Sequence, residues 1–139
     1  MRKIFFSIFS LFFVVGVLAQ GSTDPKVRKA ANEMVETYNL DETQAVTALE
    51  IQERKYRNLA EIASLENTDK DLYRHKYKAI LQSTDASLRR MLNEEQMAIY
   101  NQRAMEIRTK KAERTAELKE QGLSMEEIED TLLAEFENY

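Results

Sequence analysis

The 139-residue chain has no cysteine and no tryptophan, one proline and three glycines. Without cysteine it forms no structural disulfide, has no thiolate nucleophile and offers no thiol for lipid attachment. Three glycines are too few for a phosphate-binding loop. Residues 26–121 contain neither Gly nor Pro and are rich in strong helix formers, whereas the β-branched alternation that strands need is missing. The sequence therefore predicts an all-α protein.

Apolar residues are concentrated at the N-terminus, where two basic residues precede the stretch 4–18 and small residues lead to Ala19. This order is typical of a secretory signal. The stretch is shorter than the roughly 20 residues of a membrane-spanning helix, so a retained anchor is the less favoured alternative. We expect residues 1–19 to be a signal peptide cleaved near Ala19 and Gln20. Residues 20–139 then form one domain without stable membrane insertion.

The charge of the chain is acidic and unevenly distributed. The formal charge is −4, and removal of residues 1–19, which contain two basic residues and no acidic one, changes it to −6. A nucleic-acid-binding domain is normally basic, so we expect no nucleic-acid partner. Residues 52–91 have three more basic than acidic residues, whereas residues 20–51 and 92–139 have three and six more acidic ones. This pattern favours antiparallel pairing of segments or subunits, with a solvated helical surface as the alternative.

A leucine followed by a helix-capping box occurs at residues 40–44. Asp41 is the predicted N-cap, and Gln44 is three residues later, where its side chain reaches back to the N-cap amide. Leu40 precedes the cap. The pentapeptide therefore predicts the start of a helix.

The same design returns at residues 92–96. Asn93 is the predicted N-cap and Gln96 closes the box. Leu92 precedes the cap, and Met97 is placed to contact it as a hydrophobic staple. We expect burial of Leu92, and a stabilisation of about 1 kcal/mol from the capping bond of Gln96.

A third, degenerate copy begins at Leu123. Ser124 is the predicted cap, Glu127 takes the place of the glutamine and Ile128 completes the staple. Gly122, just upstream, suits a left-handed end of the preceding helix. This copy predicts an extra C-terminal helix within residues 123–139.

Capping signals divide the chain into helices. Asp24 before Pro25 starts the first, and Thr68 with Asp71 is a weaker start in the middle of the chain. The predicted helices are residues 25–38, 42–65, 69–91, 94–121 and 125–138. The third is the most clearly amphipathic, and its apolar stripe consists of Leu72, Tyr73, Tyr77, Ile80, Leu81, Thr84, Leu88 and Met91.

The export signal, the helical pattern and the two pentapeptides together resemble the LTxxQ family of periplasmic proteins (Spy/CpxP-like). The resemblance extends to about Ala104 and includes an aromatic residue, Tyr100, after the second motif. Asp41 and Asn93 replace the motif threonine, but both cap a helix at least as well. The acidic segment after Gly122 is an addition to the family pattern.

The resemblance implies long amphipathic helices that form a thin, curved hairpin or cradle, usually a homodimer in the periplasm. It implies an ATP-independent chaperone (holdase) or envelope-stress protein that binds partly unfolded envelope proteins and uses no cofactor. For client binding, tyrosines supply apolar rings with a polar tip, and basic residues attract acidic clients. The candidates are Tyr56, Tyr73, Tyr77, Arg54, Lys55, Arg57, Arg74, Lys76 and Lys78. The same tyrosines also suit the core of the bundle or a dimer seam.

An enzyme is disfavoured, because no nucleophile with a base and no carboxylate pair in a pocket is evident. His75, the only histidine, lies between Arg74 and Lys76, which indicates a solvated side chain. The acidic pairs at 126–127 and 129–130 are interpreted as a solvated helix face.

Two further classes stay open. A periplasmic metal sensor would need ligands, and with one histidine and no cysteine a metal site is not expected. Methionines could attract copper, although packing is their usual role; they are Met34, Met91, Met97, Met105 and Met125. A regulatory or structural module that docks one specific envelope protein has the same sequence requirements as a holdase.

Overall fold

The computed structural model describes residues 24–136, of which 88 % are helical and none is in a strand, so the predicted all-α class is confirmed. Its helices are α1 (Pro25–Tyr38), α2 (Glu42–Ile62), α3 (Leu65–Thr68), α4 (Lys70–Met91), α5 (Glu94–Glu120) and α6 (Met125–Glu135). The predicted signal peptide and the end of the last predicted helix lie outside the described residues. Between residues 24 and 136, no helix has the length and apolar character needed to cross a membrane.

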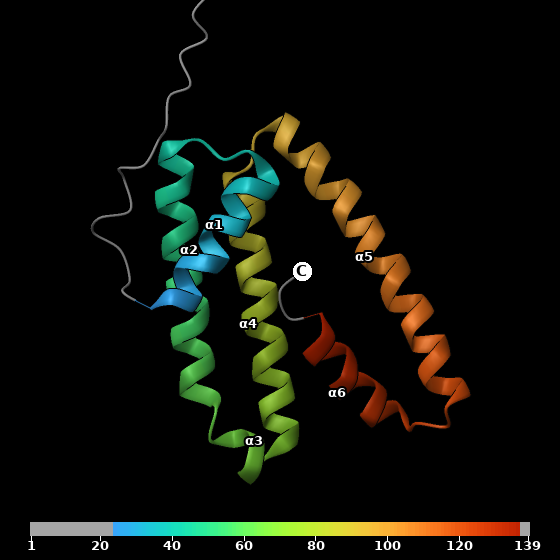
Figure 1. Cartoon of the computed structure of the whole chain (residues 1–139). Helices are drawn as coiled ribbons and strands as arrows, with labels where there is room; N and C mark the ends of the chain where they lie inside the picture. The colour runs from blue at the N-terminus through green and yellow to red at the C-terminus, as the bar shows by residue number, and fades with distance from the viewer. Residues whose placement is uncertain (1–23, 137–139) are drawn as a thin grey trace, which may run out of the picture.

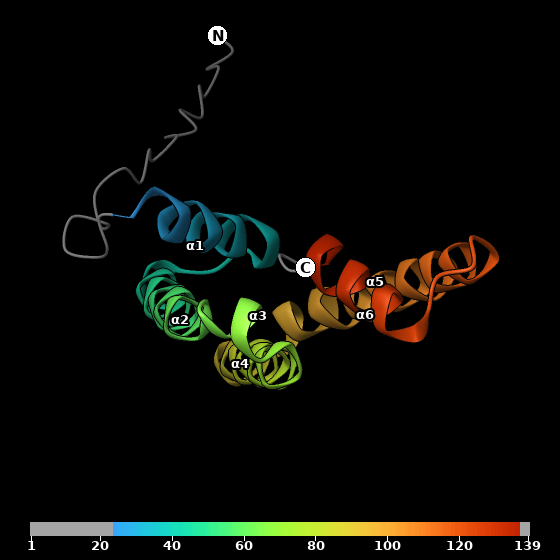
Figure 2. The same cartoon turned by 90° about the horizontal axis from the view of Figure 1, so that it is seen from below.

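Two antiparallel helices, α2 and α4, lie side by side, and α5 runs away from the end of α4 at an angle (Figure 1). α1 crosses the α2–α4 pair and packs mainly on α2. α6 folds back from the far end of α5 into the space between α5 and α4 (Figure 1). In the view from below, α1 and α6 lie on the same side of α2 and α4 (Figure 2). Two short helices therefore cover parts of one face.

Local signals determine the ends of α1. The Asp24 carboxylate accepts a hydrogen bond from the Lys26 backbone N–H at 2.8 Å, and Pro25 occupies the first turn, where its missing N–H costs no helical bond. Asn39 ends the helix with a φ of 50°, in the left-handed region that asparagine tolerates. Leu40 then turns back and its side chain is buried. The chain is thereby directed from α1 into α2.

The core consists of small clusters rather than one thick centre. The first joins α1 to α2 and consists of Val27, Ala31 and Leu49, with Tyr56 packed against it. The second joins α2 to α4 and consists of Ile62, Tyr77 and Ile80, with Leu59, Leu65, Tyr73, Leu81 and Leu133 packed against it. Leu133 belongs to α6, so the second cluster also connects this helix to the rest of the chain.

One predicted helix start is wrong. Thr68 does not cap α4, because its hydroxyl donates to the Ser64 carbonyl oxygen within α3 at 3.0 Å. Asp69 is the N-cap instead, and its carboxylate accepts a bond from the Leu72 backbone N–H at 3.0 Å. The predicted helix 42–65 is also interrupted, since α2 ends at Ile62 and the one-turn α3 follows. The other predicted starts agree with the structure.

Candidate functional site

Both glutamine pentapeptides form complete capping boxes. The Asp41 carboxylate accepts from the Gln44 backbone N–H at 2.9 Å, and the Gln44 side-chain oxygen accepts from the Asp41 N–H at 3.0 Å. Asn93 and Gln96 repeat the arrangement at 2.9 and 3.0 Å. Each box satisfies two backbone donors that the first turn of a helix leaves without partners. The pentapeptides are helix starts, as their sequence predicts.

The two capping glutamines also bind each other. Gln44 Nε2 donates to Gln96 Oε1, and Gln96 Nε2 donates to Gln44 Oε1, both at 2.8 Å. Each amide then donates to the turn before the other helix. Gln44 reaches the Met91 carbonyl oxygen at 2.8 Å, and Gln96 reaches the Asn39 carbonyl oxygen at 3.2 Å. Every donor and acceptor of the two amides is thus used.

This exchange gives the α1–α2 and α4–α5 corners the same pattern of hydrogen bonds. The two glutamines are 52 positions apart, and so are the two carbonyl groups that they reach, at Asn39 and Met91. The corners therefore carry a local two-fold relation. Because the network joins the beginnings of α2 and α5, it holds the end of the bundle from which both helices diverge (Figure 1).

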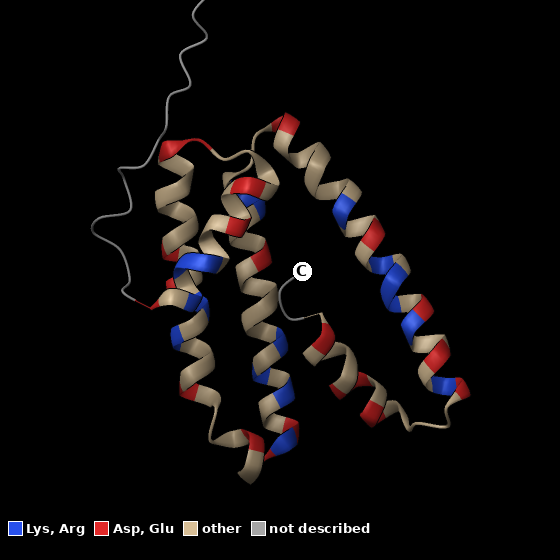
Figure 3. Cartoon of the chain, in the orientation of Figure 1, with Lys and Arg blue, Asp and Glu red and all other residues tan. Residues whose placement is uncertain are grey.

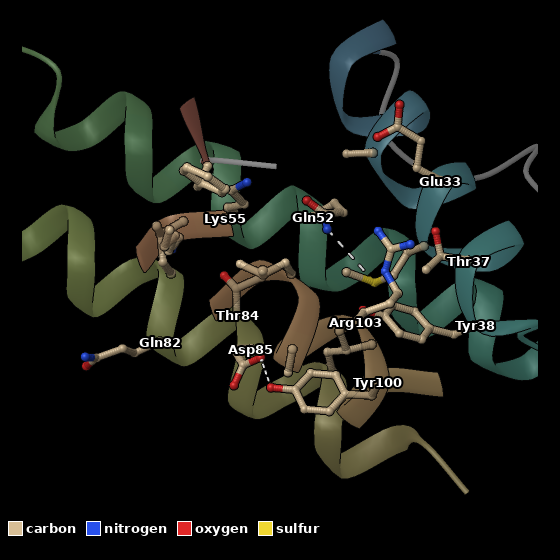
Figure 4. A pocket seen from close by; sticks show the side chains of 18 residues that line it. Glu33, Thr37, Tyr38, Gln52, Lys55, Gln82, Thr84, Asp85, Tyr100 and Arg103 are labelled. Carbon is tan, nitrogen blue, oxygen red and sulfur yellow. Dashed lines mark hydrogen bonds between the residues drawn. The ribbon is translucent and has the colours of Figure 1, made fainter. Parts of the chain in front are cut away.

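A pocket of about 350 Å³ lies on the face that α1 and α6 partly cover (Figure 4). Residues of α1, α2, α4 and α5 line it, and Phe136, directly after α6, borders it. Its apolar lining includes Met34, Leu81, Leu88 and Ile107. Polar groups from all four helices point into it (Figure 4). The pocket thus has the mixed lining that is typical of sites for small molecules or side chains.

Gln52 is the most unusual polar residue of this pocket. Its side chain is 5 % exposed, and its Nε2 has only a long contact of 4.0 Å to Met34 Sδ (Figure 4). Within residues 24–136, the Oε1 atom of Gln52 is buried without a hydrogen-bond partner. Lys55, one turn further along α2, is also buried and lines the pocket. A buried acceptor without a donor costs free energy that a bound N–H or O–H group recovers.

Tyr38 and Tyr100 also line the pocket (Figure 4). The Tyr100 hydroxyl donates to Asp85 Oδ1 at 2.6 Å (Figure 4), and burial, together with this bond, raises the pKa of Tyr100 to about 12. Burial also raises the pKa of Tyr38, although neighbouring Arg103 opposes the increase. The two rings are 6.4 Å apart. Both phenols therefore stay neutral at physiological pH and serve as hydrogen-bonding groups.

The predicted client residues are distributed between core and surface. Tyr77, Arg74 and Lys55 are buried, which agrees with the alternative that the tyrosines form the core. Tyr56 and Tyr73 are half-buried against the two core clusters.

The exposed candidates are Arg54, Arg57, Lys76 and Lys78. Arg54 donates to Ser87 Oγ at 2.7 Å, which joins α2 to α4. Client contact stays a prediction for all of them.

The interpretation of the acidic pairs as a solvated face agrees with the exposure of Glu126 and Glu127 but not with Glu129 and Asp130, which are half-buried. Glu127 closes the capping box of α6 through the Ser124 backbone N–H at 2.8 Å, which lowers the pKa of Glu127. Glu126, Glu129 and Asp130 instead form ion pairs with α4. The predicted left-handed end of α5 is present, because Gly122 has a φ of 82°.

No three His, Asp or Glu side chains of residues 24–136 are grouped so that they could hold a metal ion. His75 is exposed on α4. The pocket contains Glu33 and Asp85 among its lining residues but no histidine.

The pocket was not predicted from the sequence, although one signal was available. Gln52 follows Leu49 by three residues and precedes Tyr56 by four, which places an amide on the apolar face of α2. A polar residue in that position needs a partner or a function. Arg103 and Tyr38 offered no comparable signal, because their proximity depends on how α1 and α5 meet.

Comparison with protein-family models, with curated proteins and with solved structures found no match. The resemblance to the LTxxQ family therefore rests on the residues of the two pentapeptides and their surroundings.

Proposed function

We propose that this protein is an ATP-independent holdase of the bacterial envelope, of the kind that its pentapeptides resemble. The proposal depends mainly on one observation, the pocket between α1 and the end of α6. It combines apolar side chains with an unpaired acceptor, Gln52 Oε1, which suits a segment of unfolded chain with its apolar side chains and free backbone N–H groups. Adaptable Met and Tyr side chains allow different segments to bind.

The corner network supports this assignment. A holdase needs an accessible face on a frame that keeps its shape, and the Gln44–Gln96 exchange fixes the corners from which α2 and α5 diverge. Large apolar residues also remain exposed at other places. They are Val46, Leu72, Met105 and Met125. A thin, curved homodimer exported to the periplasm is part of the same proposal.

The test is an aggregation assay without ATP. Purified residues 20–139 should suppress the light scattering of several unrelated unfolding proteins at a several-fold excess. If no client is protected, the general holdase is excluded and a module dedicated to one envelope protein becomes the better explanation.

A pair of variants locates the activity. Ala104→Trp places a large ring in the pocket, whereas Ala112→Trp adds the same ring at an exposed position of α5 that does not line it. We expect weaker client protection by the first variant and unchanged protection by the second, with similar thermal unfolding of both. Equal protection by both would show that clients bind elsewhere.

A further inference from the structure

α6 carries only one sign of charge. Its sequence, MEEIEDTLLAE, contains five carboxylates and no Lys or Arg. The adjoining part of α4 is mainly basic, whereas the adjoining part of α5 carries Lys and Arg interleaved with Glu, as the colouring of Figure 3 shows. We give the name basic seat to five Lys and Arg residues of these two helices. They are Lys70, Arg74 and Lys78 of α4 and Lys111 and Arg114 of α5.

Ion pairs connect α6 to the basic seat. Asp130 accepts from Arg74 Nε and from Lys70 Nζ, both at 2.6 Å. Glu126 also pairs with Arg74, and Glu129 pairs with Lys78. On the other side, Glu135 accepts from Arg114 Nη2 at 2.8 Å and from its Nε. Carboxylates from both ends of α6 are therefore held by the seat.

The apolar contact beneath α6 is sparse by comparison. Ile128 is the only residue of α6 that is buried, and Leu133 is half-buried against the cluster around Tyr77. A second, open cavity of about 590 Å³ lies between α4, α5 and α6. Its lining combines Arg74, Lys78 and Lys111 of the seat with Leu132 and Leu133 of α6. α6 thus bridges the basic seat without filling the space beneath it.

Such a helix is held weakly. α6 has 11 residues, and isolated helices below about 12 to 15 residues are marginal in water. Arg74 is buried, but the carboxylates that pair with the seat are partly exposed, and ion pairs with exposed partners contribute little each and are screened by salt. Its chemistry, an acidic amphipathic helix, nevertheless matches the seat in charge and in apolar contact.

We propose that the basic seat is a docking surface for acidic amphipathic helices and that α6 is its tethered occupant. Displacement of α6 opens the seat, and because Phe136 follows α6 directly, it also opens one border of the pocket. The proposal deepens the proposed function by naming a class of segment that the protein binds. The docking of the helix itself does not depend on holdase activity.

The test uses the full chain after export, residues 20–139, and a labelled peptide of residues 123–136 as the probe. In the variant Glu126→Lys/Glu129→Lys/Asp130→Lys, the tethered helix repels the seat. Fluorescence anisotropy should then show peptide binding about tenfold tighter than to the unsubstituted chain, because the seat is free. About 0.5 M NaCl should abolish this binding.

Two matched controls define the site. Glu50→Lys/Glu61→Lys/Glu113→Lys makes the same change in net charge at exposed positions outside α6 and should not increase peptide binding. Adding Arg74→Glu to the α6 variant should remove the binding that the variant gained. Equal binding by the α6 variant and the charge-matched control, or no gain in either, would overturn the proposal.

A measurement without substitutions guards against misfolding of the variants. In the unsubstituted chain, high salt should reduce hydrogen-exchange protection of residues 125–135 while that of α2 and α4 persists. Unchanged protection of α6 in salt would contradict its weak, charge-based attachment. A salt-sensitive dimer in sedimentation, with α6 exchanged between copies, would equally overturn the tethered occupancy.

The outcomes separate the two proposals. Peptide binding to the α6 variant without any client protection would support the basic seat as a docking surface and exclude holdase activity. Client protection without peptide binding would support holdase activity and exclude the basic seat as a docking surface.

Discussion

Gln96 is 6 % exposed, and both polar atoms of its side chain have two hydrogen-bond partners. One partner belongs to its own capping box, and the others belong to the α1–α2 corner. An isolated cap contributes about 1 kcal/mol. Because loss of Gln96 also leaves Gln44 without its partner, the residue is more than a local cap.

We therefore expect Gln96→Ala to lower the free energy of unfolding by about 2 kcal/mol. The double variant with Gln44→Ala should cost less than the sum of the single changes, since each single change strands the other amide. Urea unfolding of the four chains of this cycle measures the coupling. Gln102→Ala, at an exposed position of α5, is the control and should have a small effect. Additive losses would mean that the two boxes act independently.

The leucines of the two pentapeptides differ in burial. Leu40 is 8 % exposed, whereas Leu92 is only half-buried, so the expected burial of Leu92 is incomplete. Leu40 precedes α2 in the corner that α1 covers. The two-fold relation of the corners therefore holds for their hydrogen bonds but not for their packing.

Tyr100 provides a pH-dependent test of the pocket. Burial and the bond to Asp85 raise its pKa to about 12, above the value of about 10 for a free tyrosine. The neutral phenol thus stabilises the folded chain below about pH 10, and this contribution is lost as the pH rises through the folded value. The pKa of Tyr38 is also raised, so phenolate absorbance should show a late-titrating tyrosine component that Tyr100→Phe reduces.

Asp85→Asn should lower the pKa of Tyr100, because the bond to a carboxylate favours the protonated phenol. Asp71→Asn, which alters an exposed carboxylate of α4, should leave the alkaline titration unchanged. An unaltered Tyr100 titration in Asp85→Asn would contradict the hydrogen bond.

At the scale of the elements, the helix starts come from short-range chemistry. Each capping box joins a side chain to a backbone group three residues away, so it forms independently of the rest of the fold. The starts of α2, α5 and α6 were therefore predictable. The break after Ile62 was not, because α3 begins without a side-chain cap at Ser64.

The attachment of α6 should weaken in acid. Hydrogen bonds from Arg74 lower the pKa of Asp130, and those from Arg114 lower the pKa of Glu135. Carboxyls with a lowered folded pKa stabilise the docked helix above their unfolded pKa, about 4, and this stabilisation disappears as the pH falls through the folded value. Hydrogen-exchange protection factors should therefore decrease for residues 125–135 below about pH 4. Greater acid sensitivity of α1, whose core contact is apolar, would contradict this assignment.

At the scale of the whole molecule, the uneven charges are matched within one chain. The basic middle segment includes Arg74 and Lys78 of α4, and the acidic C-terminal segment provides their partners on α6. Pairing of oppositely charged segments is therefore present within the chain, between α4 and α6, although these two helices run in the same general direction (Figure 1) rather than antiparallel.

The homodimer remains a prediction with a direct measurement. We expect sedimentation equilibrium of residues 20–139 to give a dimer at micromolar protein concentration, because the thin core leaves Val46, Leu72 and Met105 exposed. If the surface around Leu72 is part of the dimer interface, Leu72→Gln should weaken association. Ala112→Gln, at an exposed and less apolar position, should not. A monomer over the whole concentration range would contradict the dimeric cradle.

The fold was more predictable than the site. Helix class and most boundaries followed from the missing Gly and Pro and from the caps. Among the candidate client residues, the pattern did not distinguish buried Tyr77 from half-buried Tyr56, since both lie on apolar faces. It also gave no sign that Arg74 would be buried among Asp71 of its own helix and two carboxylates of α6.

The sequence by itself determined that this chain is helical and where α2, α5 and α6 begin, because propensity and capping act within a few residues. Only the tertiary structure decided that the two capping glutamines bind each other, that Gln52 faces a pocket and that α6 lies on a basic seat. Gln44 and Gln96 are 52 positions apart in the sequence, and Arg74 and Asp130 are 56 positions apart. The formation of these contacts depends on how whole helices pack, which local patterns do not encode.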